Sequence, residues 1–258
     1  MTDIVVTIDP AGIATVMLNR PARRNAVTLA MWRELGERFR GFAADPAVRV
    51  VVLTGSGGHF CAGADISEFG TVRTGVDDGA AYEHAVDGAS EAIMALGKPS
   101  IAAISGFCIG GGVGLAIACD FRIADRTARL AIPAARLGIV YGPIDSRNLL
   151  NLVGLSRAKE ILMTARRLEA AEAHRIGLVD RLADDLGTEV ATFAATLAEN
   201  APLSIAGAKL ILHALASGDA EARGAEIHAM LARALESADY QEGVRAFAEK
   251  RRPSFTGR

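Results

Sequence analysis

Residues 98–124 read KPSIAAISGFCIGGGVGLAIACDFRIA, and this stretch decides the fold. The 21 residues from Pro99 to Cys119 carry no charge, yet five of them are glycines. Because each glycine costs a helix interior about 1 kcal/mol, a continuous membrane-spanning helix is disfavoured here. The stretch instead predicts a buried strand at 100–104, a glycine loop at 110–112 and a buried helix at 113–118.

The N-terminal residues predict a β-hairpin. Residues 4–8 (IVVTI) and 13–18 (IATVML) flank Asp9-Pro10-Ala11-Gly12, a turn with proline at its second position and glycine at its last. Thr28 is then placed to cap a helix. The apolar residues of that helix follow the 3,4,3 spacing of one face: Trp32, Leu35, Phe39 and Phe42.

Further strands alternate with helices along the chain. Residues 48–53 (VRVVVL) form a β-branched run that is typical of a strand covered on both faces. A helix is predicted over about 80–96, and short strands over 121–124 and 129–132. From Asp145 onward the pattern is almost all helical, with no linker or repeat. The sequence therefore predicts one α/β domain with a helical extension.

Composition narrows the function classes. The 258 residues carry 28 Lys+Arg against 30 Asp+Glu, a net charge of −2, which argues against nucleic acid or an anionic membrane as a partner. The three cysteines are odd in number and form no CxxC motif, so neither a disulfide framework nor a metal site is indicated. With no targeting signal at the N-terminus, we expect a cytoplasmic protein.

The two glycine loops do not match nucleotide-binding motifs. Neither 54–58 nor 110–114 completes GxGxxG, and GxxxxGK[ST], GxSxG and HExxH are absent from the sequence. Such loops can instead donate hydrogen bonds. Gly111 lies where a strand gives way to a helix N-terminus, and residues 60–66 (FCAGADI) offer a second small-residue turn. One N–H from each loop could bind a single carbonyl oxygen and form an oxyanion hole, or both loops could serve tight packing alone.

Several motifs in the same order along the chain resemble the enoyl-CoA hydratase/isomerase (crotonase) superfamily. They are LNRP at 18–21, VVLTG and HFCAGADISEF within 51–69, the stretch 98–124, EAAEAHRIGLVDRL at 169–182 and DYQEGVRAFAEKRRPSFTGR at 239–258. The resemblance implies a crotonase-like α/β spiral of ββα units over 1–200. It also implies a helical trimerisation region over 201–258, an acyl-CoA substrate, and a homotrimer or a dimer of trimers. Coenzyme A would belong to the substrate, so no separate cofactor is expected.

The resemblance also assigns site residues. Ala64 and Gly111 would supply the backbone N–H groups that bind the thioester oxygen and stabilise an enolate. A coenzyme A subsite would include Ala62, Asp65, Ile66 and Ser67. Lys250 or Arg251 would meet a CoA phosphate, on this subunit or a neighbour, although both also fit a solvated helix end.

The sequence departs from the family where hydratases use two glutamates. The first of them corresponds to Gly114, and the second, which follows a proline, corresponds to Ala134. Glycine and alanine cannot transfer a proton, so hydration by the usual acid/base pair does not carry over.

Tyr141 and Asp145 are the nearest polar substitutes, on the stretch after Leu137-Gly138 that lines the acyl pocket in this family. The LG-x-x-Y pattern resembles the methylmalonyl-CoA decarboxylase-like branch, yet Ala64 stands where that branch has histidine. In the dehalogenase-like branch the acid would fall at Gly142. Asp145 is also a candidate helix N-cap, and Tyr141 a candidate pocket wall.

Other polar residues near the loops have weaker claims. A solvated role is expected for Glu68, His84, Asp87 and His59, a partnerless surface or core position for His174, and a packing role for Cys61 and Cys108. Three hypotheses follow: an enolate-forming enzyme of the hydratase/isomerase type, an acyl-CoA decarboxylase or hydrolase, and a non-catalytic acyl-CoA-binding subunit.

Overall fold

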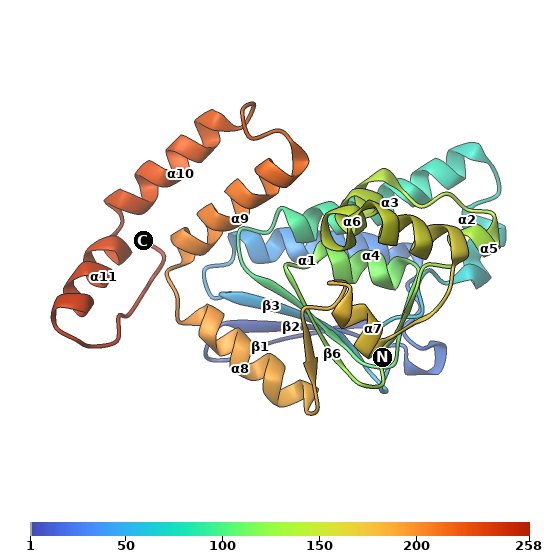
Figure 1. The fold of residues 1–258 in the computed structure, drawn as a ribbon, viewed down its shortest axis with the longest axis horizontal. Coiled ribbons are helices and arrows are strands. Elements are labelled where there is room, and N and C mark those ends of the chain that lie inside the picture. The colour runs from blue at the N-terminus through green and yellow to red at the C-terminus, as the bar shows by residue number, and fades with distance from the viewer. Residues whose placement is uncertain (1) are drawn as a thin grey trace.

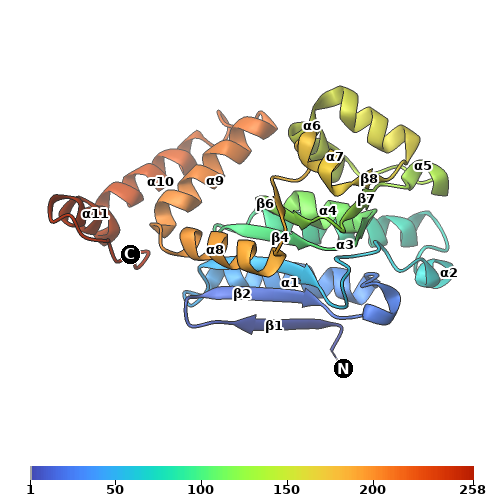
Figure 2. The ribbon, with the colours of Figure 1, turned by 60° about the horizontal axis from the view of Figure 1, so that its bottom comes forward.

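The computed structural model describes residues 2–258 (Figures 1 and 2). Its strands are β1 (Ile4–Ile8), β2 (Ile13–Leu18), β3 (Val50–Gly55), β4 (Ser100–Ile104), β5 (Phe107–Ile109), β6 (Phe121–Asp125), β7 (Arg129–Ala131), β8 (Leu168–Glu169) and β9 (Arg181–Ala183). Its α-helices are α1 (Leu29–Ala44), α2 (Phe69–Val72), α3 (Val76–Met94), α4 (Gly111–Ala118), α5 (Ala134–Leu137), α6 (Pro143–Thr164), α7 (Ala170–Arg175), α8 (Leu186–Ala198), α9 (Pro202–Ser217), α10 (Gly224–Glu236) and α11 (Ala238–Ala248). Two short 3₁₀ turns, η1 (Pro21–Arg23) and η2 (Ile66–Glu68), complete the order.

Two sheets organise the domain. One has the order β1-β2-β3-β4-β6-β9 and is parallel except for the β1–β2 hairpin, and the other has the order β5-β7-β8. The hairpin is confirmed with its predicted limits, because Ile4 pairs with Leu18 and Ile8 with Ala14. In its turn, the Asp9 carboxylate accepts the N–H of Ala11 at 2.9 Å.

β3 is covered on both faces, as its β-branched run predicted. Val51 and Leu53 belong to the main core with α1, α3 and α4, whereas Val50 and Val52 pack toward α8. Figure 1 shows α8 on one side of this sheet and the other three helices on the opposite side. The strand begins two residues later than predicted, because Val48 is held in a turn, its N–H donating to the Asp45 carbonyl.

Several other limits differ from the sequence prediction. Helix α3 runs over 76–94 rather than 80–96, and α4 begins at Gly111 rather than residue 113. Residues 107–109, for which the sequence predicted no element, form β5. The strands β8 and β9 interrupt the C-terminal part that was predicted as almost all helical. These strands are two or three residues long and exist through pairing with distant partners, which local patterns do not reveal.

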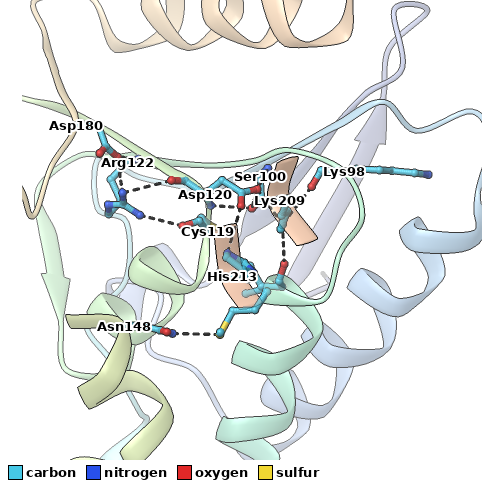
Figure 3. Close-up of polar contacts among 11 residues, drawn as sticks. Lys98, Ser100, Cys119, Asp120, Arg122, Asn148, Asp180, Lys209 and His213 are labelled. Atoms are coloured by element: carbon cyan, nitrogen blue, oxygen red, sulfur yellow. Dashed lines mark hydrogen bonds and ion pairs between the residues drawn. The ribbon is translucent and has the colours of Figure 1, made fainter. Parts of the chain in front are cut away.

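A buried ion pair fastens α9 to the sheet (Figure 3). The Lys209 ammonium lies 2.9 Å from the Asp120 carboxylate, and their side chains are only 8% and 14% exposed. Asp120 in turn accepts the backbone N–H and the hydroxyl of Ser100 on β4, each at 2.8 Å. Beyond this anchor, α10 and α11 project away from the sheets (Figure 1). No helix within residues 2–258 is long and apolar enough to cross a membrane.

Candidate active site

The two glycine loops lie side by side. The Cys61 N–H donates to the Phe107 carbonyl at 2.8 Å, and the Ile109 N–H donates back to the Cys61 carbonyl at 2.9 Å. Gly63 has φ +94°, and a Cβ there would lie 2.7 Å from the Ile109 carbonyl oxygen, so only glycine allows this approach. The loop after β3 is therefore held against β5 and the start of α4.

This arrangement brings the N–H groups of Ala64 and Gly111 close together. A Cβ on Gly111 would lie 3.9 Å from the Ala64 amide nitrogen. Gly111 is the first residue of α4, where N–H groups lack partners in the helix. Within residues 2–258, neither N–H donates a hydrogen bond. Both N–H groups therefore remain available as hydrogen-bond donors.

Both loops open into one pocket. Its walls come from the loops, from α1 and α3, and from the segment that leads into α6. Six of the residues singled out in the sequence line this pocket: Ala62, Ala64, Ile66, Gly111, Tyr141 and Asp145. Asp87 on α3 also lines it. The structure thus joins both proposed N–H donors and both substitute polar side chains in one cavity.

The Asp145 carboxylate fills the space that a side chain at position 114 would need. A Cβ on Gly114 would lie 2.3 Å from Asp145 Oδ2 and 3.2 Å from the Tyr141 hydroxyl. At the position on α4 where the resemblance implies a glutamate, this chain therefore has the carboxylate of an aspartate from α6. Glycine at 114 is what leaves room for that carboxylate.

Asp145 is not the N-cap that its position suggested. The N-cap of α6 is Gly142, and Asp145 lies in the first turn of the helix, 4% exposed. Its Oδ1 accepts the Ser90 hydroxyl of α3 at 3.1 Å. Burial raises the pKa of Asp145 to about 6, against the opposing effect of the Ser90 hydrogen bond. A carboxyl group with this pKa can take up and release a proton near neutrality.

Tyr141 lies close to Gly110 and to Asp145. Its hydroxyl is 3.4 Å from the Gly110 carbonyl oxygen, which it can reach as a donor, and it also interacts with the Asp145 carboxylate. Burial, reinforced by the negative charge of Asp145, raises the pKa of Tyr141 well above its usual value. Tyr141 therefore remains a protonated donor.

The other residues assigned to the coenzyme A subsite have different surroundings. The Asp65 carboxylate accepts the Ser67 hydroxyl at 2.6 Å and the Arg20 guanidinium at 2.9 Å. The Ser67 hydrogen bond, helped by Arg20, lowers the pKa of Asp65 despite burial, so this carboxylate stabilises the loop. Lys250 lies after α11, on the projecting C-terminal arm, and does not line the pocket of its own chain.

The remaining polar candidates, Glu68, His84, His59 and His174, do not line the pocket. Glu68 accepts the Leu29 N–H at 3.0 Å at the start of α1, and His84 is exposed. His59 does not simply face water, because its Nδ1 accepts the Phe107 N–H at 3.2 Å and its ring stacks on that phenyl group. His174 does have a partner, with Nδ1 3.0 Å from the Val179 carbonyl oxygen.

The two loop cysteines are packing residues. Cys61 and Cys108 are fully buried, and burial raises the pKa of the Cys61 thiol to about 12. A thiol that stays protonated is a poor nucleophile. Within residues 2–258, no group of three or more His, Cys, Asp or Glu side chains is arranged to hold a metal ion.

Sequence reasoning named Asp87 of α3 as a minor candidate but missed the other residues that this helix contributes. Tyr82, Glu83, Val86 and Asp87 all line the pocket, and Ser90 reaches Asp145. These residues are spaced three and four apart, so they lie along one side of the helix. That spacing could have predicted which face of α3 lines the pocket. Trp32 of α1 was recognised as an apolar residue but not as part of the pocket wall.

Comparisons with known proteins identify the family of this chain. The enoyl-CoA hydratase/isomerase family model matches residues 9–258. A Rhizobium meliloti protein named "probable enoyl-CoA hydratase" is 36% identical over 250 residues, which cover 95% of each chain.

Solved structures give the same result. The enoyl-CoA hydratase/carnithine racemase from Magnetospirillum magneticum superposes with a TM-score of 0.93 at 36% identity, covering 100% of this chain and 97% of its own. The enoyl-CoA hydratase from Bacillus anthracis gives 0.90 at 32% identity, with full coverage of both chains. The predicted crotonase fold is thereby confirmed, and this chain belongs to the enoyl-CoA hydratase/isomerase family of acyl-CoA enzymes.

Proposed function

We propose that this enzyme transfers a proton at the α-carbon of an acyl-CoA thioester, through an enolate, and so shifts a carbon–carbon double bond. The observation that carries the proposal is the position of Asp145. Its carboxylate, with a pKa raised to about 6, shares one pocket with the unpartnered N–H groups of Ala64 and Gly111. The pocket thus holds a proton acceptor and two donors for a developing oxyanion.

The steps follow from these groups. The Ala64 and Gly111 N–H groups bind the thioester oxygen, and the Asp145 carboxylate removes the α-proton as the C–H bond breaks. Negative charge collects on the thioester oxygen, where both donors stabilise it. In a β,γ-unsaturated acyl group, protonated Asp145, which can exchange its proton with solvent, then donates a proton to the γ-carbon and leaves an α,β-double bond. One carboxylate suffices for this proton shift, whereas hydration also needs a group that activates water.

Decarboxylation of a carboxylated acyl-CoA is the second candidate function. Loss of CO₂ generates the enolate without a base, and Tyr141 supplies a protonated hydroxyl beside Gly110. However, the same pocket is lined by three carboxylates, those of Glu83, Asp87 and Asp145, against one cation, Arg73, which is paired with Glu83. An anionic acyl group would be repelled by them, so we favour proton transfer.

The decisive experiment compares three thioesters in D₂O by mass spectrometry. We expect 3-butenoyl-CoA to become crotonyl-CoA with deuterium incorporated, and crotonyl-CoA to hydrate very slowly, because each missing acid/base group removes about 10²–10⁴-fold of rate. Methylmalonyl-CoA should remain intact. Rapid hydration or CO₂ release would overturn the assignment, and binding without any reaction would favour a non-catalytic acyl-CoA-binding subunit.

We also propose that the enzyme is a homotrimer or a dimer of trimers, assembled through its C-terminal helices. α10 and α11 project from the domain and leave large apolar side chains exposed, among them Leu231, Leu235, Val244 and Phe247. A second copy could cover this surface and bring Lys250 of one subunit toward the pocket of another. Light scattering should give at least three times the monomer mass, and a monomer at micromolar concentration would contradict this proposal.

A further inference from the structure

Two aromatic side chains at the inner wall of the pocket form a hydrogen-bonded pair. The Trp32 indole N–H, from α1, donates to the Tyr82 hydroxyl, from α3, at 3.0 Å. Both side chains line the pocket, yet they are only 1% and 2% exposed. The Trp32 ring also lies beside the proposed thioester site, because a Cβ on Gly111 would come within 2.9 Å of its Cζ2 atom.

The direction of this hydrogen bond leaves one proton without an acceptor. An indole N–H can only donate, so the Tyr82 oxygen accepts and its own O–H must point elsewhere. Within residues 2–258, that O–H donates to no acceptor. Burial raises the pKa of Tyr82 to about 12, so the proton stays on the oxygen. Accepting from Trp32 also polarises the hydroxyl and makes it a stronger donor.

A buried donor without a partner costs free energy, and a bound ligand can satisfy it. We propose that Tyr82, oriented by Trp32, is a specificity-determining residue that selects acyl groups carrying a neutral oxygen acceptor beyond the α-carbon. This inference rests on the proposed function, because it assumes that the thioester oxygen lies at Ala64 and Gly111. The acyl chain then passes the Trp32 ring and reaches the Tyr82 hydroxyl.

The charges in the pocket argue for a neutral oxygen rather than a carboxylate. Asp145, Asp87 and Glu83 line the cavity, and burial raises the pKa of each. The Arg73 guanidinium also lines the cavity but is paired with Glu83 at 2.7 Å. A hydroxyl or ketone oxygen can accept from Tyr82 without adding a further negative charge.

Binding of matched thioesters tests this inference. Butanoyl-CoA is compared with 3-hydroxybutanoyl-CoA and 4-hydroxybutanoyl-CoA, with the fluorescence of Trp32, the only tryptophan of the chain, as the signal. We expect the wild type to bind one hydroxylated thioester about tenfold more tightly than butanoyl-CoA, the effect of one good hydrogen bond. In Tyr82→Phe this preference should fall to about one. Tyr240→Phe, at a tyrosine that is 52% exposed on α11, is the matched control and should keep the preference.

A second measurement needs no variant. The single indole N–H gives one NMR signal, and a ligand that accepts from Tyr82 should shift it more than butanoyl-CoA does. A preference that survives Tyr82→Phe, equal indole shifts with all three thioesters, or tighter binding of succinyl-CoA than of butanoyl-CoA would overturn the inference. The proposed function is judged separately, by deuterium exchange with 3-butenoyl-CoA in the wild type.

Discussion

Replacing Gly111 with proline should strongly reduce the turnover of acyl-CoA thioesters while the protein remains folded. Proline has no N–H, so one of the two proposed oxyanion donors is lost, and the loss of such a donor costs about 10²–10³-fold in kcat. The helix itself tolerates proline at this position, because Gly111 is the first residue of α4. The measurement is the rate of 3-butenoyl-CoA isomerisation, with circular dichroism as the check on folding.

Gly111→Ala is the matched control for this variant. Any Cβ at position 111 would lie 2.9–3.0 Å from the Trp32 ring, so alanine shares the Cβ contact of proline but keeps the N–H. We expect most of the activity loss to appear only with proline. Equal losses in both variants would mean that crowding of Trp32 is responsible and that the Gly111 N–H does not act on the thioester.

Local patterns were sufficient to predict the elements that form from neighbouring residues. In the hairpin at 4–18, the residues Asp9-Pro10-Ala11-Gly12 favour the turn that joins its strands. Helix α1 begins after Thr28, whose hydroxyl accepts the Met31 N–H at 3.2 Å. β5 was missed because its three residues become a strand only by pairing with β7 more than twenty residues later. Such pairing leaves no periodic signal in the strand itself.

In the candidate site too, features that depend on neighbouring residues could be predicted, whereas those that depend on distant residues could not. The two glycine loops could be predicted as hydrogen-bond donors from their residues alone, and the missing glutamates pointed to Tyr141 and Asp145. The sequence could not decide between a capping and a chemical role for Asp145. The role of Asp145 depends on Ser90 of α3, 55 residues away along the chain, which donates to its carboxylate. It also depends on Gly114 of α4, 31 residues away, which has no side chain and so leaves room for that carboxylate.

Replacing Asp145 with asparagine should remove the proton transfer that we propose. Deuterium exchange at the α-carbon should fall by about 10²–10⁴-fold, because asparagine cannot accept a proton. In the wild type the carboxylate is the active form, so the rate should rise with pH through about 6 and then level off. Ser90→Ala removes a hydrogen bond that lowers this pKa, so the profile should move to higher pH. An unmoved profile would mean that Asp145 is not the group that titrates.

The same substitution should stabilise the protein, which separates a chemical role of Asp145 from a structural one. Its pKa is about 6 in the folded state, above its ordinary value of 3.8, so the folded state binds this proton more tightly than the unfolded state. The stabilisation from the protonated form is complete below pH 4 and is lost as the pH rises to 6, a difference of about 3 kcal/mol. The asparagine side chain does not titrate, so Asp145→Asn should match the wild type in free energy of unfolding near pH 4 and exceed it by up to that amount at pH 7.5. Urea unfolding at both pH values measures the difference. If the variant is instead less stable than the wild type at pH 7.5, the ionised carboxylate holds α6 in place and has a structural role. If the variant is more stable but inactive, the charged Asp145 side chain weakens the fold and is retained for its chemistry.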